Sequence, residues 1–284
     1  MRTQHAKATP ARMPVEINRE VKRSALRYFG GKWAIAPWVI EHMPTHRVYV
    51  EPFGGAASVL LRKPRSKVEV YNDLDEEIVG IFRILQNAAL CTALCRRLRR
   101  TPYARREFEL AFQESTDPVE RTRRAIIRAY MSFHHSALFN PRKTTFADAM
   151  HKRSGSSKAS EWAGYPRTLA AVCRRLRGVV IEHGEASRII RVQDTPETLF
   201  FVDPPYVGST RDKGTTYRHE MSDAQHIALL MQLRSISGRA MVTGYPSALY
   251  DDLLHDWKRL ERRHYAKGSM TTPRTEVLWI SPAR

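Results

Sequence analysis

Short apolar runs recur in the first and last thirds of the chain, and most are followed by a stretch in which apolar residues repeat every three or four positions. A run rich in branched and aromatic side chains predicts a buried strand, and an amphipathic stretch predicts a helix. The five runs lie at Val48–Val50, Val68–Tyr71, Val179–Glu182, Leu199–Val202 and Ala240–Thr243. Strands that alternate with helices predict an α/β fold with a mostly parallel sheet.

The amphipathic stretches complete this alternation. Helices are predicted at Ala34–His42, Val59–Leu61, Glu76–Gln86, Thr168–Leu176, Ser222–Arg234 and Ala248–Trp257. Ser222 stands at the start of its helix, where a serine side chain caps free backbone N–H groups. Two further segments close the chain, at Leu260–Tyr265 and Glu276–Ile280, and the Gly/Ser/Thr/Pro-rich loop between them predicts a hairpin.

The stretch from Ala88 to about Trp162 interrupts the alternation. It is strongly basic and helical in pattern, with helices predicted at Phe108–Phe112 and Ala125–Phe133 and a polar linker at His151–Ser160. We interpret residues 88–165 as a helical domain inserted between two parts of one α/β domain, residues 25–87 and 166–284. Residues 1–24 form a loose basic arm in this interpretation.

The formal net charge of +18 over 284 residues predicts a polyanionic partner. A well solvated surface is the alternative, but the cations cluster in the insertion instead of spreading evenly. The candidates for contacts with nucleic acid are Arg105, Arg123, Arg124, Arg128, Arg142 and Lys143, together with Tyr217 from the polar loop Val207–Met221. We therefore interpret the insertion as a nucleic-acid-binding domain.

The sequence disfavours several other classes of protein. No apolar run is long enough to span a membrane, and the residues before Ala25 lack the apolar core of a signal peptide, which predicts a cytoplasmic protein. Cys91, Cys95 and Cys173 lack metal-binding spacing and are expected to be reduced, structural thiols. His134 and His135 have no carboxylate or cysteine at ligand spacing, so no metal site is expected.

A candidate active site follows the strand Leu199–Val202. The next residues are Asp203-Pro204-Pro205-Tyr206, and neither proline can donate to a sheet ladder. The motif therefore presents a carboxylate, rigid carbonyls and an aromatic ring at the carboxyl edge of the sheet, where open α/β sheets bind ligands. Asp203 and the Pro204 carbonyl can accept both hydrogens of an exocyclic amine while Tyr206 stacks on the ring. A plain strand-to-turn stop is the alternative.

Two glycine turns and one acid are candidates for holding a cofactor. In the first turn, Leu26–Trp33, two glycines let the backbone approach a ligand, and Lys32 can meet a carboxylate or a phosphate. The second turn, Glu51–Ser58, matches the pattern G-x-G-x-x-G poorly, so no dinucleotide is indicated. Asp73 follows this turn by about the twenty residues that place an acid beside ribose hydroxyls. Either Asp73 or Asp75 could instead cap the next helix.

In this order, the motifs make the sequence resemble the Dam-type, or alpha-group, DNA adenine-N6 methyltransferases from Leu26 to Pro282. Arg27–Lys32 resembles the N-terminal cofactor motif of that family, Glu51–Ala56 its methionine-side cofactor turn, Asn72–Asp73 its ribose-binding acid and Thr275–Trp279 its closing hairpin. Asp203-Pro204-Pro205-Tyr206 is identical to the family's catalytic motif.

The resemblance implies a Rossmann-like methyltransferase fold, whose mostly parallel seven-stranded sheet ends in an antiparallel hairpin, with an inserted target-recognition domain. It implies S-adenosylmethionine as methyl donor, S-adenosylhomocysteine as product, double-stranded DNA as substrate, and no metal. The implied cofactor residues are Tyr28, Phe29, Gly30, Lys32, Glu51, Pro52, Phe53, Gly54, Gly55, Asp73 and Asp203. The implied catalytic residues, which receive a flipped adenine, are Asp203, Pro204, Pro205 and Tyr206. A monomer is expected, with a dimer as the alternative.

Other interpretations stay open at this point. A cytosine-N4 or an RNA-adenine methyltransferase would use the same amine chemistry, although an aspartate in the first motif position favours adenine. A DNA-binding protein without activity is disfavoured because Lys32, Asp73 and Asp203 are all present. Ala57 replaces a glycine frequent in the family, and Phe133–Asn140 lacks the Asn-Gly…Arg pattern of members that recognise GATC. The recognition sequence and a cognate nuclease therefore stay open.

Overall fold

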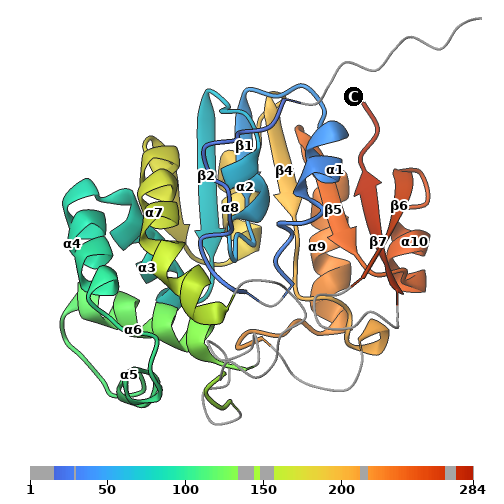
Figure 1. Cartoon of the computed structure of the whole chain (residues 1–284). Helices are drawn as coiled ribbons and strands as arrows, with labels where there is room; N and C mark the ends of the chain where they lie inside the picture. Colours follow the sequence, from blue (N-terminus) through green and yellow to red (C-terminus); the bar gives the residue numbers. More distant parts are fainter. Residues whose placement is uncertain are drawn as a thin grey trace, which may run out of the picture.

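A computed structural model of the chain describes residues 16–28, 30–133, 144–147, 157–211 and 217–283. Seven strands form one sheet in the order β3-β2-β1-β4-β5-β7-β6 (Figure 1). Their bounds are β1 Val48–Glu51, β2 Val68–Asp73, β3 Val179–His183, β4 Thr198–Val202, β5 Arg239–Gly244, β6 Lys258–Tyr265 and β7 Pro273–Ile280. Strands β1 to β5 pair in parallel, and β7 pairs antiparallel with both β5 and β6. The predicted α/β fold and closing hairpin are confirmed.

The order of the strands indicates where a ligand-binding crevice lies on the sheet. Chain order runs outward from β1 to β2 and β3 on one side, then continues with β4 and β5 on the other. The loops after β1 and β4 therefore diverge at the carboxyl edge, and such a switch point leaves room for a ligand.

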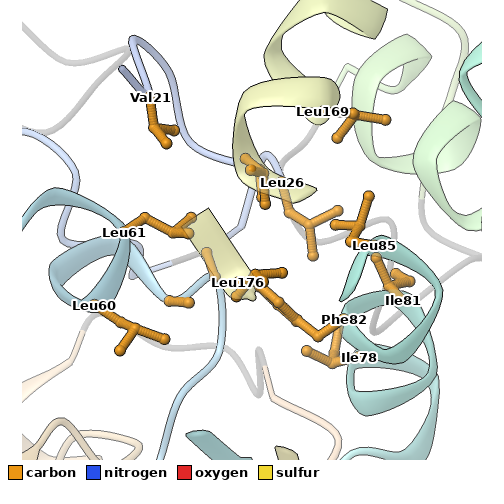
Figure 2. Close-up of a cluster of buried hydrophobic side chains, with 14 of the residues drawn as sticks. Val21, Leu26, Leu60, Leu61, Ile78, Ile81, Phe82, Leu85, Leu169 and Leu176 are labelled. Atoms are coloured by element: carbon orange, nitrogen blue, oxygen red, sulfur yellow. The ribbon is translucent and has the colours of Figure 1, made fainter. Parts of the chain in front are cut away.

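Helices cover both faces of the sheet (Figure 1). Side chains alternate along each strand, so Tyr49 and Tyr71 join the apolar cluster on one face while Val50 and Val70 join that on the other. The first cluster includes α1 Ala36–Glu41, α2 Ser58–Arg62, α3 Glu76–Gln86, α4 Ala88–Arg99, α6 Pro118–Met131 and α7 Lys158–Leu176. The second includes α8 Ala186–Gln193, α9 Asp223–Ser235 and α10 Ala248–Leu253. Figure 2 shows the first cluster, where Leu26, Phe82 and Leu176 meet from distant parts of the chain.

The helices of the expected insertion differ from their predicted bounds. The helix predicted at Ala125 begins at Pro118 instead, because Asp117 caps it by accepting from the N–H groups of Val119 and Glu120. The short helix α5 spans Arg105–Leu110 and ends before Phe112. The sequence pattern also missed α4 as a separate helix, and α8 after β3.

The predicted polar linker is wrong over the last of its residues. Ser157 caps α7, which begins at Lys158 and buries Trp162 and Tyr165 before the predicted start at residue 168. Residues 151–156 of this linker lie outside the described residues. The helix α7 continues across residues 165 and 166, where we expected a domain boundary, so the boundaries stay a prediction.

Two other expectations have an outcome in the fold. The basic arm is not loose where the structure describes it, because Val21 is buried and the Asn18 N–H donates to the Arg62 carbonyl at 2.8 Å. The three cysteines are free and buried, as predicted for structural thiols.

Among the described helices, none alone is long and apolar enough to cross a membrane, and only α3 with α4, bent by 103°, meets that criterion as a pair.

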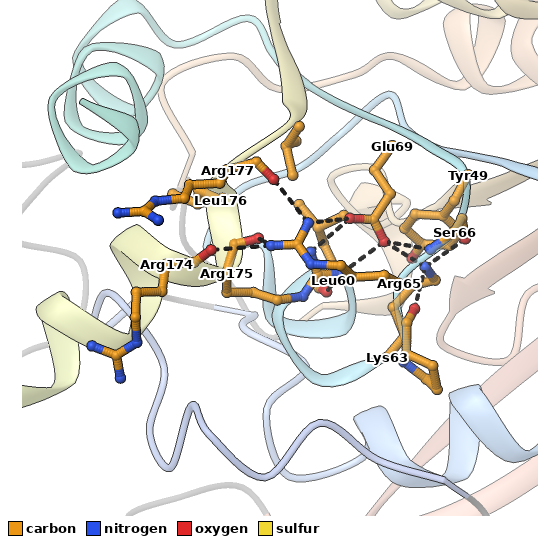
Figure 3. A network of polar contacts seen from close by, with 12 residues as sticks. Tyr49, Leu60, Lys63, Arg65, Ser66, Glu69, Arg174, Arg175, Leu176 and Arg177 are labelled. Atoms are coloured by element: carbon orange, nitrogen blue, oxygen red, sulfur yellow. Dashed lines mark hydrogen bonds and ion pairs between the residues drawn. The ribbon is translucent and has the colours of Figure 1, made fainter. Parts of the chain in front are cut away.

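A buried ionic network joins α7 to the sheet on the side away from the crevice (Figure 3). Arg175 binds both carboxylate oxygens of Glu69, at 2.6 and 2.8 Å, and Lys63 Nζ lies 2.7 Å from Glu69 Oε1. Arg65 donates to the carbonyl oxygens of Arg174, Arg175 and Arg177 at the end of α7. Because all three ionic side chains are buried, removing one partner leaves an unpaired charge in the core.

Candidate active site at the carboxyl edge of the sheet

A cavity of about 370 Å³ lies at the switch point of the sheet. Its walls come from the turns after β1, β2, β3 and β4, from the first glycine turn, and from the segment 217–221 before α9. The predicted cofactor residues that line it are Tyr28, Gly30, Lys32, Glu51, Pro52, Phe53, Gly54, Gly55, Asp73 and Asp203. Of the predicted catalytic residues, Asp203 and Pro205 line it. Phe29 lies outside the described residues.

The turn between β1 and α2 needs its glycines for two different reasons. A β-carbon on Gly54 would lie 2.1 Å from the Tyr71 ring, so the backbone packs directly on that ring. Gly55 has a φ of +46°, in the left-handed region that glycine adopts most easily. Ala57 also adopts this region, with a φ of +51°, where the family often has glycine. The turn therefore presents backbone to the cavity.

The sequence left open whether Asp73 or Asp75 caps the helix α3, and the structure decides between them. Asp75 caps α3 by accepting from the N–H groups of Glu77 and Ile78. Asp73 holds the glycine turn instead, because its Oδ2 accepts from the Gly55 N–H at 2.7 Å. Burial raises the pKa of the Asp73 carboxyl. The helix cap is therefore Asp75, and Asp73 lines the cavity.

A second buried carboxylate stands at the end of β1. Glu51 Oε1 accepts hydrogen bonds from the Tyr49 hydroxyl at 2.8 Å and from the Leu60 N–H at 2.7 Å. Burial raises the pKa of Glu51 to about 8. Glu51 therefore lines the cavity largely protonated at neutral pH.

Lys32 is buried between two carboxylates. Its Nζ lies 2.7 Å from Asp203 Oδ1 and 3.7 Å from Glu276 Oε1, and it donates to the Gly30 carbonyl at 2.9 Å. Burial opposes the charge on this amine, but Asp203 and Glu276 outweigh it and raise the pKa of Lys32. Lys32 is therefore a fixed cation at the centre of the site.

Asp203 has one oxygen engaged and one directed elsewhere. Oδ1 takes both the Lys32 amine and the Thr243 hydroxyl, which donates at 2.9 Å from β5. No hydrogen bond from the described residues reaches Oδ2, and the side chain is 18% exposed. The carboxylate is thus held at one oxygen while the other stays available to a ligand.

Tyr206 belongs to a second group of contacts beside Asp203. Its hydroxyl donates to Glu276 Oε1, and its ring centroid lies 4.7 Å from Lys32 Nζ. The Tyr245 ring meets the Tyr206 ring edge-on, with centroids 4.6 Å apart. Burial and the nearby Glu276 raise the pKa of Tyr206, which keeps its hydroxyl protonated.

Sequence reasoning missed Thr243, Tyr245 and Glu276 as site residues. Thr243 and Tyr245 stand at the carboxyl end of β5, the position that made Asp203 a candidate, and this signal could have found them. Glu276 lies within the closing-hairpin motif, yet its role depends on β7 lying beside β5.

The candidate DNA-binding residues lie in several different environments. Arg123, Arg124 and Arg128 on α6 are mostly buried and pair with Glu120, Glu107 or Glu77. Arg105 is exposed over the Phe146 ring, with its guanidinium carbon 5.0 Å from the centroid. Tyr217 lines the cavity, and its hydroxyl packs so closely on Gly30 that a β-carbon at position 30 would overlap it. Arg142, Lys143, His134 and His135 lie outside the described residues. That these side chains contact DNA stays a prediction.

No group of three or more His, Cys, Asp and Glu side chains among the described residues could hold a metal ion. The site is therefore built from one buried lysine, several carboxylates, tyrosines and glycine turns.

Comparisons with known proteins agree on one family. The model of the family described as D12 class N6 adenine-specific DNA methyltransferase matches residues 28–267. The chain is 23% identical over 278 residues to the Retron Ec67 DNA adenine methylase of Escherichia coli, which covers 91% of each chain. It is 22% identical over 269 residues to the DNA adenine methylase of Serratia marcescens, covering 89% of this chain and 93% of the relative. Modification methylase LlaI of Lactococcus lactis is 24% identical over 201 residues, 68% of this chain and 31% of that protein.

Proposed function

Because the chain belongs to the D12 class of N6 adenine-specific DNA methyltransferases, we propose that the cavity at the sheet edge is its methyl-transfer site. The chain is an adenine-specific DNA methyltransferase, and the family implies S-adenosylmethionine as methyl donor.

The donor fits the half of the cavity formed by the glycine turns. Ser58 Oγ is buried in the cavity wall and has no hydrogen-bond partner among the described residues, so it is available to a polar ligand. Asp73 is placed to accept from ribose hydroxyls, and the turn around Gly54 and Gly55 lets the ligand approach the backbone. S-adenosylmethionine supplies an electrophilic methyl group on a positively charged sulfur. Asp73 and Asp203 give the cavity carboxylates that suit a cation.

The adenine is proposed to bind at Asp203. The N6 amine is a poor nucleophile because its lone pair is delocalised into the ring. Accepting its hydrogens at Asp203 Oδ2 and at the Pro204 carbonyl draws this nitrogen toward tetrahedral geometry and directs the lone pair at the methyl group. Lys32 and Thr243 hold Oδ1, so the carboxylate does not turn away during the reaction. Such positioning supplies several kcal/mol of a reaction barrier.

Tyr206 is proposed to stack on the flipped adenine. The base must leave the duplex to reach a cavity at the edge of the sheet. Glu276 holds the Tyr206 hydroxyl, and Lys32 and the Tyr245 ring contact the Tyr206 ring, so the ring is held in one orientation beside Asp203. Pro205 keeps the backbone between Asp203 and Tyr206 rigid.

The DNA-binding side of the site is also part of this proposal. Residues 88–165 are proposed as the target-recognition unit, with Arg105 among its contacts to the duplex. For Arg123, Arg124 and Arg128, a contact with phosphate requires opening the ion pairs that hold them. We propose that the chain acts as a monomer, because the acids, the lysine and the tyrosine all come from one chain.

The proposal rests on the Asp203 carboxylate, whose Oδ1 is held by Lys32 and Thr243 while no hydrogen bond from the described residues reaches Oδ2. We expect Asp203→Ala to abolish methyl transfer to a DNA duplex while the protein still folds and binds S-adenosylmethionine; its unfolding midpoint should fall, because the buried Lys32 loses its nearest counter-charge. Asp256→Ala, which removes an exposed acid paired with Arg234, is the control and should keep full activity. Product nucleosides are identified by mass spectrometry. N4-methylcytosine as product, or turnover by Asp203→Ala, would overturn the assignment.

A further inference from the structure

The end of β6 carries exposed arginines with no acidic partner. Arg262 and Arg263 are exposed, and no hydrogen bond or ion pair from the described residues reaches either guanidinium. Arg259 on the same strand differs, since Asp251 and Glu261 lie 2.8 and 2.6 Å from its nitrogens. β6 is the outermost strand of the sheet, so its free edge and these cations face solvent.

The register of the hairpin places Arg262 beside the methyl-transfer site, whereas the next residue, Arg263, points to the opposite face of the sheet. Arg262 lies directly opposite Glu276 in the antiparallel pair β6–β7. Directly opposite residues share a face of the sheet, with β-carbons about 5 Å apart. Glu276 is the carboxylate that accepts from Tyr206 and lies near Lys32, so Arg262 stands on the same face one strand further out.

Arg274 connects this edge to the base-binding side of the cavity. It precedes Glu276 by two residues on β7 and therefore points to the same face. Its guanidinium donates to the Tyr245 hydroxyl at 3.2 Å and lies 5.3 Å from the centre of that ring. Tyr245 in turn meets Tyr206 edge-on. A continuous line of aromatic and cationic groups thus runs from Tyr206 to the outer strand.

This edge lies at the opposite end of the sheet from α4, α5 and α6 (Figure 1). The α6 arginines are paired with acids, whereas no acid among the described residues has to release Arg262 before it can meet a phosphate. A guanidinium binds phosphate oxygens through two parallel hydrogen bonds, which favours arginine at such a position.

We propose that the hairpin surface, formed by Arg262 and Arg274, binds the phosphate backbone of duplex DNA beside the flipped adenine. The inference rests on the proposed function, because it takes the cavity around Asp203 and Tyr206 as the place where the adenine enters. DNA is then held on both sides of the cavity, by the helical region on one side and by the hairpin surface on the other.

The test compares two double variants that lose the same charge. Arg262→Gln with Arg274→Gln removes the two cations of the hairpin surface. Lys67→Gln with Arg191→Gln is the matched control, because both residues are exposed and lie toward the amino edge of the sheet. Binding of a fluorescent duplex is measured from about 50 to 200 mM salt, the range over which phosphate contacts weaken markedly.

The hairpin variant should bind more weakly at every salt concentration, and its plot of log affinity against log salt should be shallower by roughly 0.9 per lost phosphate contact. The control should keep the wild-type slope, and all three proteins should bind S-adenosylmethionine equally. A hairpin variant with the wild-type slope, or a control that loses as much slope, overturns the inference. The proposed function fails separately, when the wild-type protein forms no N6-methyladenine in the same duplex.

Discussion

Replacing Thr243 with valine removes one hydrogen bond from Asp203 while it keeps the size and branching of the side chain. Thr243 is fully buried on β5, and its hydroxyl donates to Asp203 Oδ1 at 2.9 Å. Lys32, whose Nζ lies 2.7 Å from the same oxygen, is unchanged in the variant, so the carboxylate keeps one of its two donors. We therefore expect a reduced rate with an intact site.

The size of the effect follows from the kind of bond removed. A hydrogen bond to a charged group contributes about 1.5–3 kcal/mol. If all of it is used to orient Asp203 toward the amine, the turnover number falls by roughly 10-fold to 100-fold, because each 1.36 kcal/mol is about a factor of ten in rate. The Kd for S-adenosylmethionine should stay close to the wild-type value, since the hydroxyl points to the carboxylate.

Steady-state methyl transfer to a DNA duplex, together with calorimetry of donor binding, measures both quantities. Thr243→Ser is the matched control, because serine keeps the hydroxyl and should keep most of the rate. A Thr243→Val enzyme with wild-type turnover would show that Lys32 alone orients Asp203. Equal losses in the serine and valine variants would show that packing on β5, not the hydrogen bond, limits the rate.

Three further changes test other parts of the structure. Asp73→Ala should weaken donor binding sharply in calorimetry without changing the product, because Asp73 holds the glycine turn and faces the cavity; unchanged affinity would remove it from the site. Because burial raises the pKa of Glu51 from 4.5 to about 8, the native chain binds a proton there that the unfolded chain lacks between these values. This group therefore makes the free energy of unfolding fall as pH rises, by up to about 1.4 kcal/mol per pH unit, and Glu51→Gln should flatten that part of the slope in urea unfolding at pH 5.5 and 7.5. Glu69→Gln should lower the free energy of unfolding by about 3–5 kcal/mol, since Lys63 and Arg175 lose their shared counter-charge in the core, and a stability loss below about 1 kcal/mol would mean that the network relaxes.

Local patterns in the sequence were enough to predict the strands and the main motif. The predicted runs of three or four residues match β1 to β5 within a residue or two of the observed bounds, and the central strands β1, β2, β4 and β5 are apolar because both of their faces are buried. The two prolines after Val202 end β4 and leave Asp203 at the sheet edge, which depends on the backbone chemistry of neighbouring residues alone. The glycine turns were also recognisable, since close approach to a ring or a left-handed φ excludes most other residues.

Pairings between distant residues were decided only by the tertiary structure. The sequence could not distinguish Asp73 from Asp75 as the helix cap, because both have cap spacing and only the position of the Gly55 N–H separates them. The clustered positive charge made the α6 arginines candidates for DNA contacts. Arg128 instead pairs with Glu77, which lies 51 residues away in the sequence and comes close because α3 packs on α6.

The contacts around Lys32 and Asp203 show why these pairings could not be predicted from local sequence. Thr243 and Glu276 stand 40 and 73 residues after Asp203. The strand-end position of Thr243 marks it as a candidate, but nothing local shows that either residue meets Lys32 or Asp203. They meet because β4, β5 and β7 are consecutive strands in the sheet, an order set by burial of both faces over the whole domain. Local sequence therefore determined which groups are present at each strand end, and the sheet order determined which of them touch.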